Sequence, residues 1–352
     1  MKKILKIGDY TYAQSLQHFS QSYLTGFPQR EQFLFQHVRK VEFVFFRHKI
    51  LNNLEDVYEE RQRIKNYLQN HHFNFLMIDN PLSSLLITAD CTVPILFDSI
   101  DWYSEMYLRE FGIDKRYYLL HYGLLQLLQM AERVISQSPF NLNALQKWGL
   151  KTKKTVVIPN GYDARYFYPY SDLRINRLKK YFSGKYNIDL NKRKIIVYTG
   201  KLGKWYKNIK VIVNAIEDNQ VFFIVGDGPL LKEIPGRKNI IKCGRVDFKK
   251  VPDYTNIADV LVFPVDKDCS PLAVSEYCAV GKPIVIGKGR IEWLLNNSQN
   301  SCLVNNNVSS WRIGIKKALE MKQINKNCSL NIAKKLSWQI LAKKFTDFIN
   351  LA

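Results

Sequence analysis

Short apolar runs typical of buried strands alternate with helical segments, and this alternation occurs twice along the chain. The strand-like runs of the first half lie at residues 3–8, 40–48, 73–79 and 93–99. Those of the second half lie at residues 194–200, 221–229, 240–246, 260–265 and 282–287. Strands that alternate with helices form βαβ units and parallel sheets. We therefore expect an α/β protein made of two facing Rossmann-like domains.

The boundary between these domains is expected in a polar, lysine-rich stretch. At 352 residues the chain is too long for one simple core, and its 46% hydrophobic residues supply enough material for two. We expect an N-terminal domain at residues 1–170, a linker at 171–193 and a C-terminal domain at 194–335. An amphipathic helix is expected at residues 336–352.

The cysteines and the apolar runs indicate where the protein works. Six cysteines are scattered without any C-x-x-C pair, which argues against a zinc site or a redox motif and favours cytosolic thiols. The apolar run near the first residue is too short for a signal peptide. No stretch approaches the roughly 18 apolar residues of a membrane span. We expect a cytoplasmic protein, soluble or peripheral at a membrane.

The net charge is strongly positive, at +21 from 52 basic and 31 acidic residues. Such an excess attracts nucleic acid, anionic lipid or a phosphorylated small molecule. The lysines are spread along the chain, so an evenly basic surface explains the charge equally well. A nucleic-acid-binding protein on a Rossmann-like scaffold should cluster its basic residues on one helix or among exposed aromatics, and the sequence has no such cluster.

A helix start is expected directly after the strand-like run at 260–265. Ser270 suits the N-cap, Pro271 suits the first helical position, and Gly281 suits the position after the last turn. The N–H groups of Ser270, Leu272 and Ala273 would then form an anion site suited to a diphosphate. Ligands of doubly wound sheets bind at this carboxyl edge of the strands.

Two carboxylates flank this helix start. Glu276 lies about one and a half turns into the helix, where it can accept hydrogen bonds from a ribose diol. Asp268 precedes the helix and would face the group on the other side of the phosphates. The implied order of ribose, diphosphate and hydroxylated group is that of a nucleotide sugar. The alternative is that both acids only cap and decorate a surface helix.

Two further loops follow strand-like runs. Lys201 and Lys207 lie near a second helix start, where two cations would neutralise a diphosphate leaving group. Gly226 and Gly228 end the run at 221–229, where close approach of the backbone to a ligand, or tight packing, needs no side chain. Solvated surface lysines and simple turn glycines are the alternatives.

The first half offers fewer residues that could take part in catalysis. Asp98 and Asp101 follow the strand-like run at 93–99 and are candidates for a general base on an acceptor hydroxyl. Capping of the helix that starts near Trp102 explains them equally well. His18 and His121 are weaker candidates. The six histidines show no metal-binding spacing, and we expect neither a metal nor a cofactor.

Five segments, in this order and spacing, resemble the landmarks of GT-B-fold glycosyltransferases of the family-four type, also called glycosyl transferases group 1. They lie at residues 156–167, 200–216, 224–229, 261–286 and 336–345, within a resemblance that covers about 130–350. The family has a Glu-x7-Glu element, in which Asp268 replaces the first Glu and Glu276 matches the second. Asp266-Lys267-Asp268 also matches the D-x-D metal motif of the other glycosyltransferase fold, but its place late in a Rossmann-like half makes a metal role unexpected.

The resemblance implies that Glu276 binds the ribose and Asp268 the donor sugar. The final helix would cross back to the N-terminal domain. The residues implied to hold the phosphates are Lys201, Lys207 and the backbone of Cys269, Ser270, Pro271 and Leu272, and the stretch around Val246 is implied to hold the base. The family usually has Arg at the Lys201 position and Gly-Phe-Gly where this chain has residues 269–272.

The leading interpretation is a metal-independent glycosyltransferase that uses a nucleotide-diphosphate sugar, with a UDP- or GDP-sugar favoured. The acceptor would be a glycan, a lipid-linked sugar or another hydroxyl compound held by the N-terminal domain. Family similarity favours retention of configuration, whereas Asp98 and Asp101 leave inversion open. A non-catalytic GT-B partner subunit is a further alternative.

An anionic membrane surface is a candidate partner of the N-terminal domain, and a general basic surface with a soluble acceptor is the competing interpretation. The residues that suggest a membrane surface are Arg30, Arg39, Lys40, Arg47 and Lys49 beside Phe27, Phe33 and Phe35.

Overall fold

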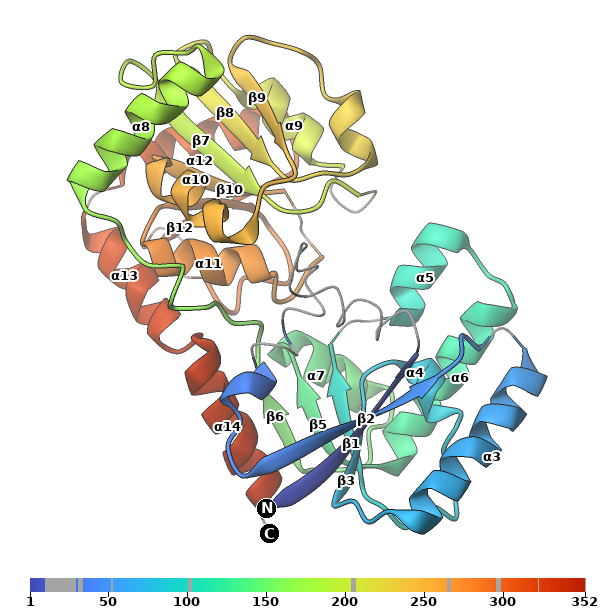
Figure 1. Ribbon diagram of the computed structural model, residues 1–352. Helices are drawn as coiled ribbons and strands as arrows, with labels where there is room; N and C mark the ends of the chain where they lie inside the picture. Colours follow the sequence, from blue (N-terminus) through green and yellow to red (C-terminus); the bar gives the residue numbers. More distant parts are fainter. Residues whose placement is uncertain are drawn as a thin grey trace. The chain divides into compact units, whose positions relative to one another are not determined.

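The structure is a computed structural model that describes residues 1–9, 30, 34–51, 53–100, 103–203, 207–264, 267–295, 299–321 and 323–351. The chain forms two compact units. The first contains Met1–Pro159 and Gln339–Ala352, and the second contains Asn160–Trp338. Each unit has a six-stranded sheet with helices packed on it (Figure 1). The expected α/β class with two Rossmann-like domains is therefore confirmed, and so is the return of the last helix to the first unit.

The sheet of the first unit has the strand order β2-β1-β3-β4-β5-β6, and its neighbouring strands are parallel. Its strands are β1 (Lys2–Asp9), β2 (Val41–His48), β3 (Phe75–Ile78), β4 (Ile95–Ser99), β5 (Ala131–Ser136) and β6 (Thr155–Val157). Every residue of β3 and β4 is buried, as expected for central strands that are covered on both faces. Its helices are α3 (Leu54–Asn70), α4 (Pro81–Ser84), α5 (Tyr103–Phe111), α6 (Lys115–Met130), α7 (Pro139–Lys147) and α14 (Trp338–Asn350).

The last helix, α14, is held in the first unit by cations at its C-terminal end. The buried Arg133 on β5 donates hydrogen bonds to the carbonyl oxygens of Phe348 and Leu351. The Lys2 ammonium group donates to the carbonyl oxygen of Ile349. The last carbonyls of a helix have no partner within the helix, and positive groups stabilise this end of the helix dipole. The sequence predicts the helix itself, and these contacts explain where it docks.

The sheet of the second unit has the strand order β12-β11-β10-β7-β8-β9, with parallel neighbours. Its strands are β7 (Lys194–Thr199), β8 (Gln220–Val225), β9 (Ile240–Gly244), β10 (Val260–Phe263), β11 (Ile284–Gly287) and β12 (Ser301–Val304). The chain runs outward from β7 through β8 and β9, and then restarts at β10 on the other side of β7. This reversal between β7 and β10 is the topological switch point of a doubly wound sheet.

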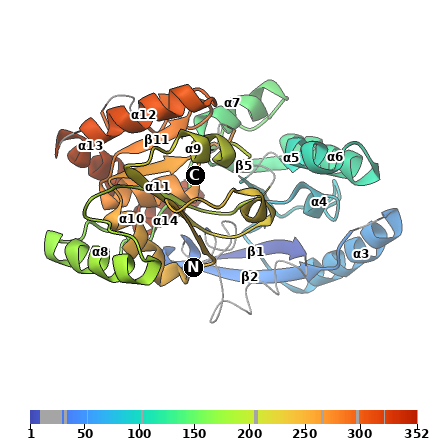
Figure 2. The same ribbon diagram turned by 90° about the horizontal axis from the view of Figure 1, so that it is seen from above.

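Helices cover both faces of this second sheet. They are α8 (Asp172–Tyr186), α9 (Ile209–Ala215), α10 (Val251–Ile257), α11 (Leu272–Val280), α12 (Val308–Glu320) and α13 (Gln323–Lys334), with two short 3-10 helices, η3 (Pro229–Glu233) and η4 (Phe248–Lys250). Helix α12 packs against α9, whereas α8 packs against α10. Figure 2 shows α12 and α8 on opposite sides of the unit.

The stretch at residues 171–193, expected as a linker, contains helix α8 and belongs to the second unit. The Ser171 side chain caps this helix by accepting a hydrogen bond from the Arg174 N–H. The buried Phe182 packs against Tyr254, with ring centroids 4.5 Å apart. The many lysines that made this stretch resemble a linker therefore occupy the outer part of an amphipathic helix. The division between the units lies at Pro159–Asn160 instead.

Candidate functional site

The predicted donor-binding residues lie in loops at one edge of the second sheet. Lys201 follows β7, Gly226 follows β8, Val246 follows β9 and Asp268 follows β10. Because all these strands are parallel, their carboxyl ends share an edge. Lys201 and Asp268 follow the two strands that flank the switch point, which is where ligands of open α/β sheets bind.

Helix α11 begins one residue later than the sequence suggested. Pro271 occupies the N-cap position, Leu272 is the first helical residue, and Gly281 ends the helix in the left-handed conformation. The expected N-cap role of Ser270 is wrong, because its hydroxyl accepts a hydrogen bond from the Asn160 N–H at 2.8 Å. The Ser270 N–H also has a partner, since it donates to Oδ1 of Asp268 at 3.0 Å. The Val274 N–H donates to the Pro271 carbonyl oxygen at 3.1 Å, so the N–H groups of Leu272 and Ala273 are the ones in the first turn suited to an anion.

The loop before α11 is held by residues that the sequence analysis did not assign to the site. The Asn160 side-chain amide donates to the Ser270 carbonyl oxygen at 2.7 Å. The Ser275 hydroxyl donates to the Asn160 carbonyl oxygen, also at 2.7 Å. The Trp293 indole N–H donates to the Cys269 carbonyl oxygen at 2.8 Å. The Asn160-Gly161 pair, a sequence common in turns, is the feature that marks this position in the sequence.

The two acids differ in their surroundings. Glu276 is 6% exposed, and α11 is buried from Val274 to Val280, so the alternative of a decorated surface helix is wrong for Glu276. Asp268 is half-buried, and desolvation raises the pKa of its carboxyl group to about 6, although the Ser270 N–H opposes this shift. A buried carboxylate is costly unless polar groups satisfy it. Ionised carboxylates have several acceptor positions, so both acids can accept hydrogen bonds from ligand hydroxyl groups beside their contacts within the protein.

Three glycines hold the ends of β7 and β8 together. A Cβ atom on Gly226 would lie 1.8 Å from the Gly200 carbonyl oxygen, and one on Gly228 would lie 2.5 Å from the Leu202 carbonyl oxygen. All three glycines have φ between 146° and 150°. Tight backbone packing therefore accounts for Gly226 and Gly228, and their approach to a ligand stays a prediction. This packing fixes the loop that carries Lys201.

Both predicted phosphate-binding lysines are exposed at this edge. Lys201 follows β7, and its carbonyl oxygen accepts a hydrogen bond from the Tyr198 hydroxyl at 2.6 Å. Lys207 precedes α9, whose N-cap is Asn208. Val246 is partly buried against the core of the unit. These positions are compatible with the predicted roles in phosphate and base binding, which stay predictions.

Asp98 is unsuited to the general-base role that the sequence suggested. It lies within β4, is fully buried, and pairs with Arg30 at 3.2 Å. Burial raises the pKa of Asp98, and the Arg30 guanidinium group opposes that shift. The Arg30 side chain also donates to the Pro159 carbonyl oxygen at 2.9 Å. This carboxylate is committed to a buried ion pair rather than presented to an acceptor.

The remaining predicted groups do not add to this site within the described residues. Asp101, His18 and Asp266 are outside the residues that the structure describes. His121 lies on α6 against the ring of Trp148, with centroids 5.3 Å apart. Within the described ranges, no three His, Cys, Asp or Glu side chains gather into a group that could hold a metal ion. All six cysteines are thiols rather than disulfides.

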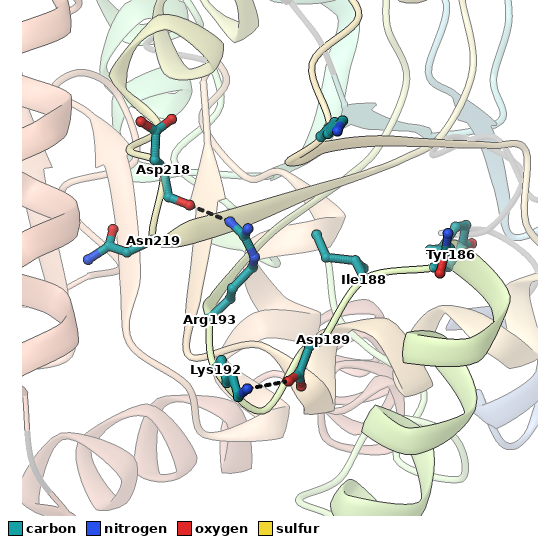
Figure 3. Close-up of a pocket in the computed structure, with 9 residues that line it drawn as sticks. Tyr186, Ile188, Asp189, Lys192, Arg193, Asp218 and Asn219 are labelled. Atoms are coloured by element: carbon teal, nitrogen blue, oxygen red, sulfur yellow. Dashed lines mark hydrogen bonds and ion pairs between the residues drawn. The ribbon is translucent and has the colours of Figure 1, made fainter.

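An open pocket lies at the opposite edge of the second sheet (Figure 3). Its lining residues precede β7, β8 and β9, so it is formed at the amino ends of these strands. Arg193 donates a hydrogen bond to the Asp218 carbonyl oxygen, and Lys192 lies 3.8 Å from Asp189. None of the predicted site residues lines this pocket. It is also far along the strands from the switch point, so it is not the candidate site.

Residues 193–321 match the sequence model of a family described as glycosyl transferases group 1. No curated protein sequence matches the chain. Among solved structures, sucrose-phosphate synthase from Thermosynechococcus elongatus is similar over 99% of this chain and 98% of its own, with 15% identity and a TM-score of 0.73. Anabaena HepE in complex with UDP-glucose is similar over 99% of this chain and 98% of its own, with 15% identity and a TM-score of 0.69. WaaG, a glycosyltransferase involved in lipopolysaccharide biosynthesis, is similar over 99% of this chain and 100% of its own, with 14% identity and a TM-score of 0.69.

The structural matches extend over nearly the whole chain and show that it has the GT-B fold. The family match places a glycosyltransferase group 1 domain in the second unit, on the strands and helices that carry the candidate site. The chain is a glycosyltransferase of the GT-B type, and the resemblance that its sequence landmarks suggest is confirmed.

Proposed function

We propose that this glycosyltransferase transfers a sugar from a nucleoside-diphosphate sugar to an acceptor hydroxyl, with the donor bound at the carboxyl edge of the second sheet. One observation carries this proposal: the start of α11 lies between Asp268 and the buried Glu276, directly after a strand at the switch point. A UDP-sugar is the favoured donor, because the similar HepE structures contain UDP, UDP-glucose, or UDP with glucose.

Each group in this site has a proposed part in the reaction. Glu276 accepts hydrogen bonds from the two ribose hydroxyls, and Asp268 accepts one from the donor sugar. The first N–H groups of α11 bind the diphosphate, together with Lys201 and Lys207. These cations neutralise the charge that develops on the leaving diphosphate as the bond to the sugar breaks. The proposed reaction therefore requires neither a metal ion nor a cofactor.

Calorimetry with UDP, GDP and ADP tests donor binding, and release of the nucleoside diphosphate from a panel of nucleotide sugars tests turnover. We expect millimolar or tighter affinity for one of the three, and turnover that EDTA leaves unchanged. Absence of binding by all three contradicts the donor site. Binding without turnover on any donor favours the non-catalytic partner subunit. Turnover that EDTA abolishes and Mn²⁺ restores contradicts metal independence.

The acceptor is proposed to be a glycan, a lipid-linked sugar or another hydroxyl compound. The involvement of the similar WaaG in lipopolysaccharide biosynthesis supports the first two. Because Asp98 is paired with Arg30, it gives no support to an inverting mechanism with this residue as base. The stereochemistry of the product, read by NMR spectroscopy of the anomeric proton, distinguishes retention from inversion. The nucleic-acid-binding alternative is set aside, since the second unit matches a glycosyltransferase family.

Two of the five basic residues first suggested for membrane binding are committed to other contacts. Arg30 is fully buried in its ion pair, and Lys49 pairs with Asp56 at 2.9 Å and with Glu59. Phe35 stacks on a neighbouring ring in the first unit. Arg39 and Lys40 are exposed, whereas Phe27 and Phe33 lie outside the described residues. No helix within the described ranges has the length and apolar character needed to cross a bilayer.

We propose helix α6 as another surface for peripheral membrane contact. Its side chains Tyr118, Tyr122 and Leu125 are 61%, 65% and 38% exposed. Their spacing of four and three residues places them along one face of the helix, and Lys115 and Arg116 precede them. Exposed aromatic and basic groups of this kind suit the interface of an anionic bilayer.

Co-sedimentation with vesicles of neutral or anionic lipid, at low and high salt, tests this placement. We expect sedimentation with anionic vesicles at low salt, and less of it after Tyr118→Ser and Tyr122→Ser substitution together. Negligible sedimentation under all conditions favours a soluble acceptor and leaves the donor site unaffected.

A further inference from the structure

Asn160 is the first residue of the second unit, and hydrogen bonds connect it both to helix α11 of the proposed donor site and to the loop before that helix. Its backbone N–H donates to the Ser270 hydroxyl oxygen at 2.8 Å, and its side-chain amide donates to the Ser270 carbonyl oxygen at 2.7 Å. Its own carbonyl oxygen accepts a hydrogen bond from the Ser275 hydroxyl at 2.7 Å. Asn160 therefore binds the loop before α11 and the first turns of that helix at the same time.

The position of this loop determines the direction of the first N–H groups of α11. Pro271 has no N–H, and no side chain caps the helix. The usual local device for fixing a helix start is thus absent from α11, and contacts from elsewhere in the second unit take its place. Ser270 and Ser275, the two residues that Asn160 contacts, are both fully buried. Buried polar groups in such an arrangement have few alternative partners, so the arrangement is rigid.

We infer that Asn160 is a positioning residue for the diphosphate of the donor. This inference rests on the proposed function, and it assigns to Asn160 an effect on the phosphates through Ser270 and α11 rather than direct contact with the donor. Electrostatic stabilisation of an anion depends on donors that are already oriented before the ligand arrives. Loss of the side-chain amide leaves the Ser270 carbonyl without this donor and frees the loop to move.

The test compares UDP with uridine, which has the same base and ribose but no phosphate. We expect Asn160→Ala to weaken UDP binding about five- to tenfold, the value of one hydrogen bond. We expect uridine binding to change less than about twofold. UDP is measured by calorimetry and uridine by competition or ligand-observed NMR spectroscopy, well below the unfolding temperature of each variant. Ser275→Ala removes the third hydrogen bond and is expected to act in the same direction.

Asn239→Ala is the matched control. Asn239 is also buried, and its side-chain amide donates to two backbone carbonyl oxygens, those of Glu217 and Gln220, at 3.0 and 3.2 Å. It precedes β9 and so lies at the opposite edge of the same sheet. A general loss of stability in the second unit affects both variants, whereas a loss of phosphate positioning affects only Asn160→Ala. We therefore expect Asn239→Ala to bind UDP like the wild-type protein.

The outcomes separate this inference from the proposed function. A wild-type protein that binds none of UDP, GDP and ADP overturns the proposed donor site, and the role of Asn160 with it. If the wild-type protein binds UDP, unchanged UDP affinity in Asn160→Ala overturns the positioning role alone. Equal weakening of UDP and uridine overturns it as well, because it shows a general effect on the site. If Asn160→Ala does not fold, the same comparison in Ser275→Ala decides between these results.

Discussion

Replacing Asp98 by Asn tests whether this acid is part of the buried structure or part of the chemistry. Asp98 and Arg30 are at most 1% exposed, with 3.2 Å between Oδ1 and Nη2. Removing one partner of a buried ion pair costs about 3–5 kcal/mol, because the other charge stays buried. The Arg30 guanidinium group keeps its hydrogen bond to the Pro159 carbonyl oxygen. We therefore expect the lower end of that range, about 3 kcal/mol, which corresponds to a fall in melting temperature of roughly 6–12 °C.

Thermal and urea unfolding measure this loss, and two further variants provide controls. Glu132→Gln removes one partner of the exposed pair between Glu132 and Lys154, at 2.9 Å, and should cost less than about 1 kcal/mol. The double substitution Arg30→Met with Asp98→Asn removes both buried charges and should recover part of the loss. Turnover per folded molecule should stay near the wild-type value in Asp98→Asn, because the carboxylate does not face an acceptor.

Two results refute this reasoning. A loss of stability below about 1 kcal/mol shows that the ion pair does not have the buried environment described above. A fall in kcat of about 100-fold or more, measured where the variant is folded, assigns a general-base role to Asp98 after all.

Three other substitutions test the donor site. Glu276→Gln should weaken UDP binding by about 1.5–3 kcal/mol, the value of hydrogen bonds to a charged group, and an unchanged calorimetric affinity assigns Glu276 to structure alone. The pKa of Asp268 is raised to about 6, so its carboxylate becomes protonated as the pH drops through 6 and can no longer accept the hydrogen bond from the donor sugar. We therefore expect kcat/KM for the donor to fall over this pH range. Asp268→Asn should abolish this inflection, and its persistence contradicts the assignment. Gly226→Ala should destabilise the second unit by about 3 kcal/mol or more in urea unfolding, because its Cβ would lie 1.8 Å from the Gly200 carbonyl oxygen. Gly203→Ala, whose Cβ meets nothing within 4 Å, is the control and should be nearly neutral by comparison.

The sequence by itself determined the fold class and the edge of the sheet where we propose the donor site. Apolar runs of strand length, separated by helical segments, specify parallel βαβ units, because only crossover connections join parallel strands. In a parallel sheet, the residues that follow the strands lie at one edge. Lys201 and Asp268 could therefore be assigned to the same candidate site from the sequence. The position of Gly281 at the end of α11 was also predictable, since a helix end in the left-handed conformation favours glycine.

Some elements carried local signals that the sequence analysis did not use. Helix α12 begins after Asn307, whose side chain accepts a hydrogen bond from the Ser310 N–H. Its buried residues Trp311, Ile315 and Ala318 follow helical spacing. Helix α8 was missed because its exposed lysines outnumber its one fully buried residue, Phe182. A short apolar stripe is easily hidden by a high charge content.

The tertiary structure alone decided which polar groups are available for chemistry. Asp98 resembled a base in the sequence, but Arg30, 68 residues away, binds it in the core of the first unit. Ser270 resembled an N-cap, but Asn160, 110 residues away, bonds to its hydroxyl. Local periodicity determines helices and strands, because neighbouring residues share one face. Hydrogen bonds between distant residues depend on how the crossovers bring separate strand ends together, and no local pattern encodes that arrangement.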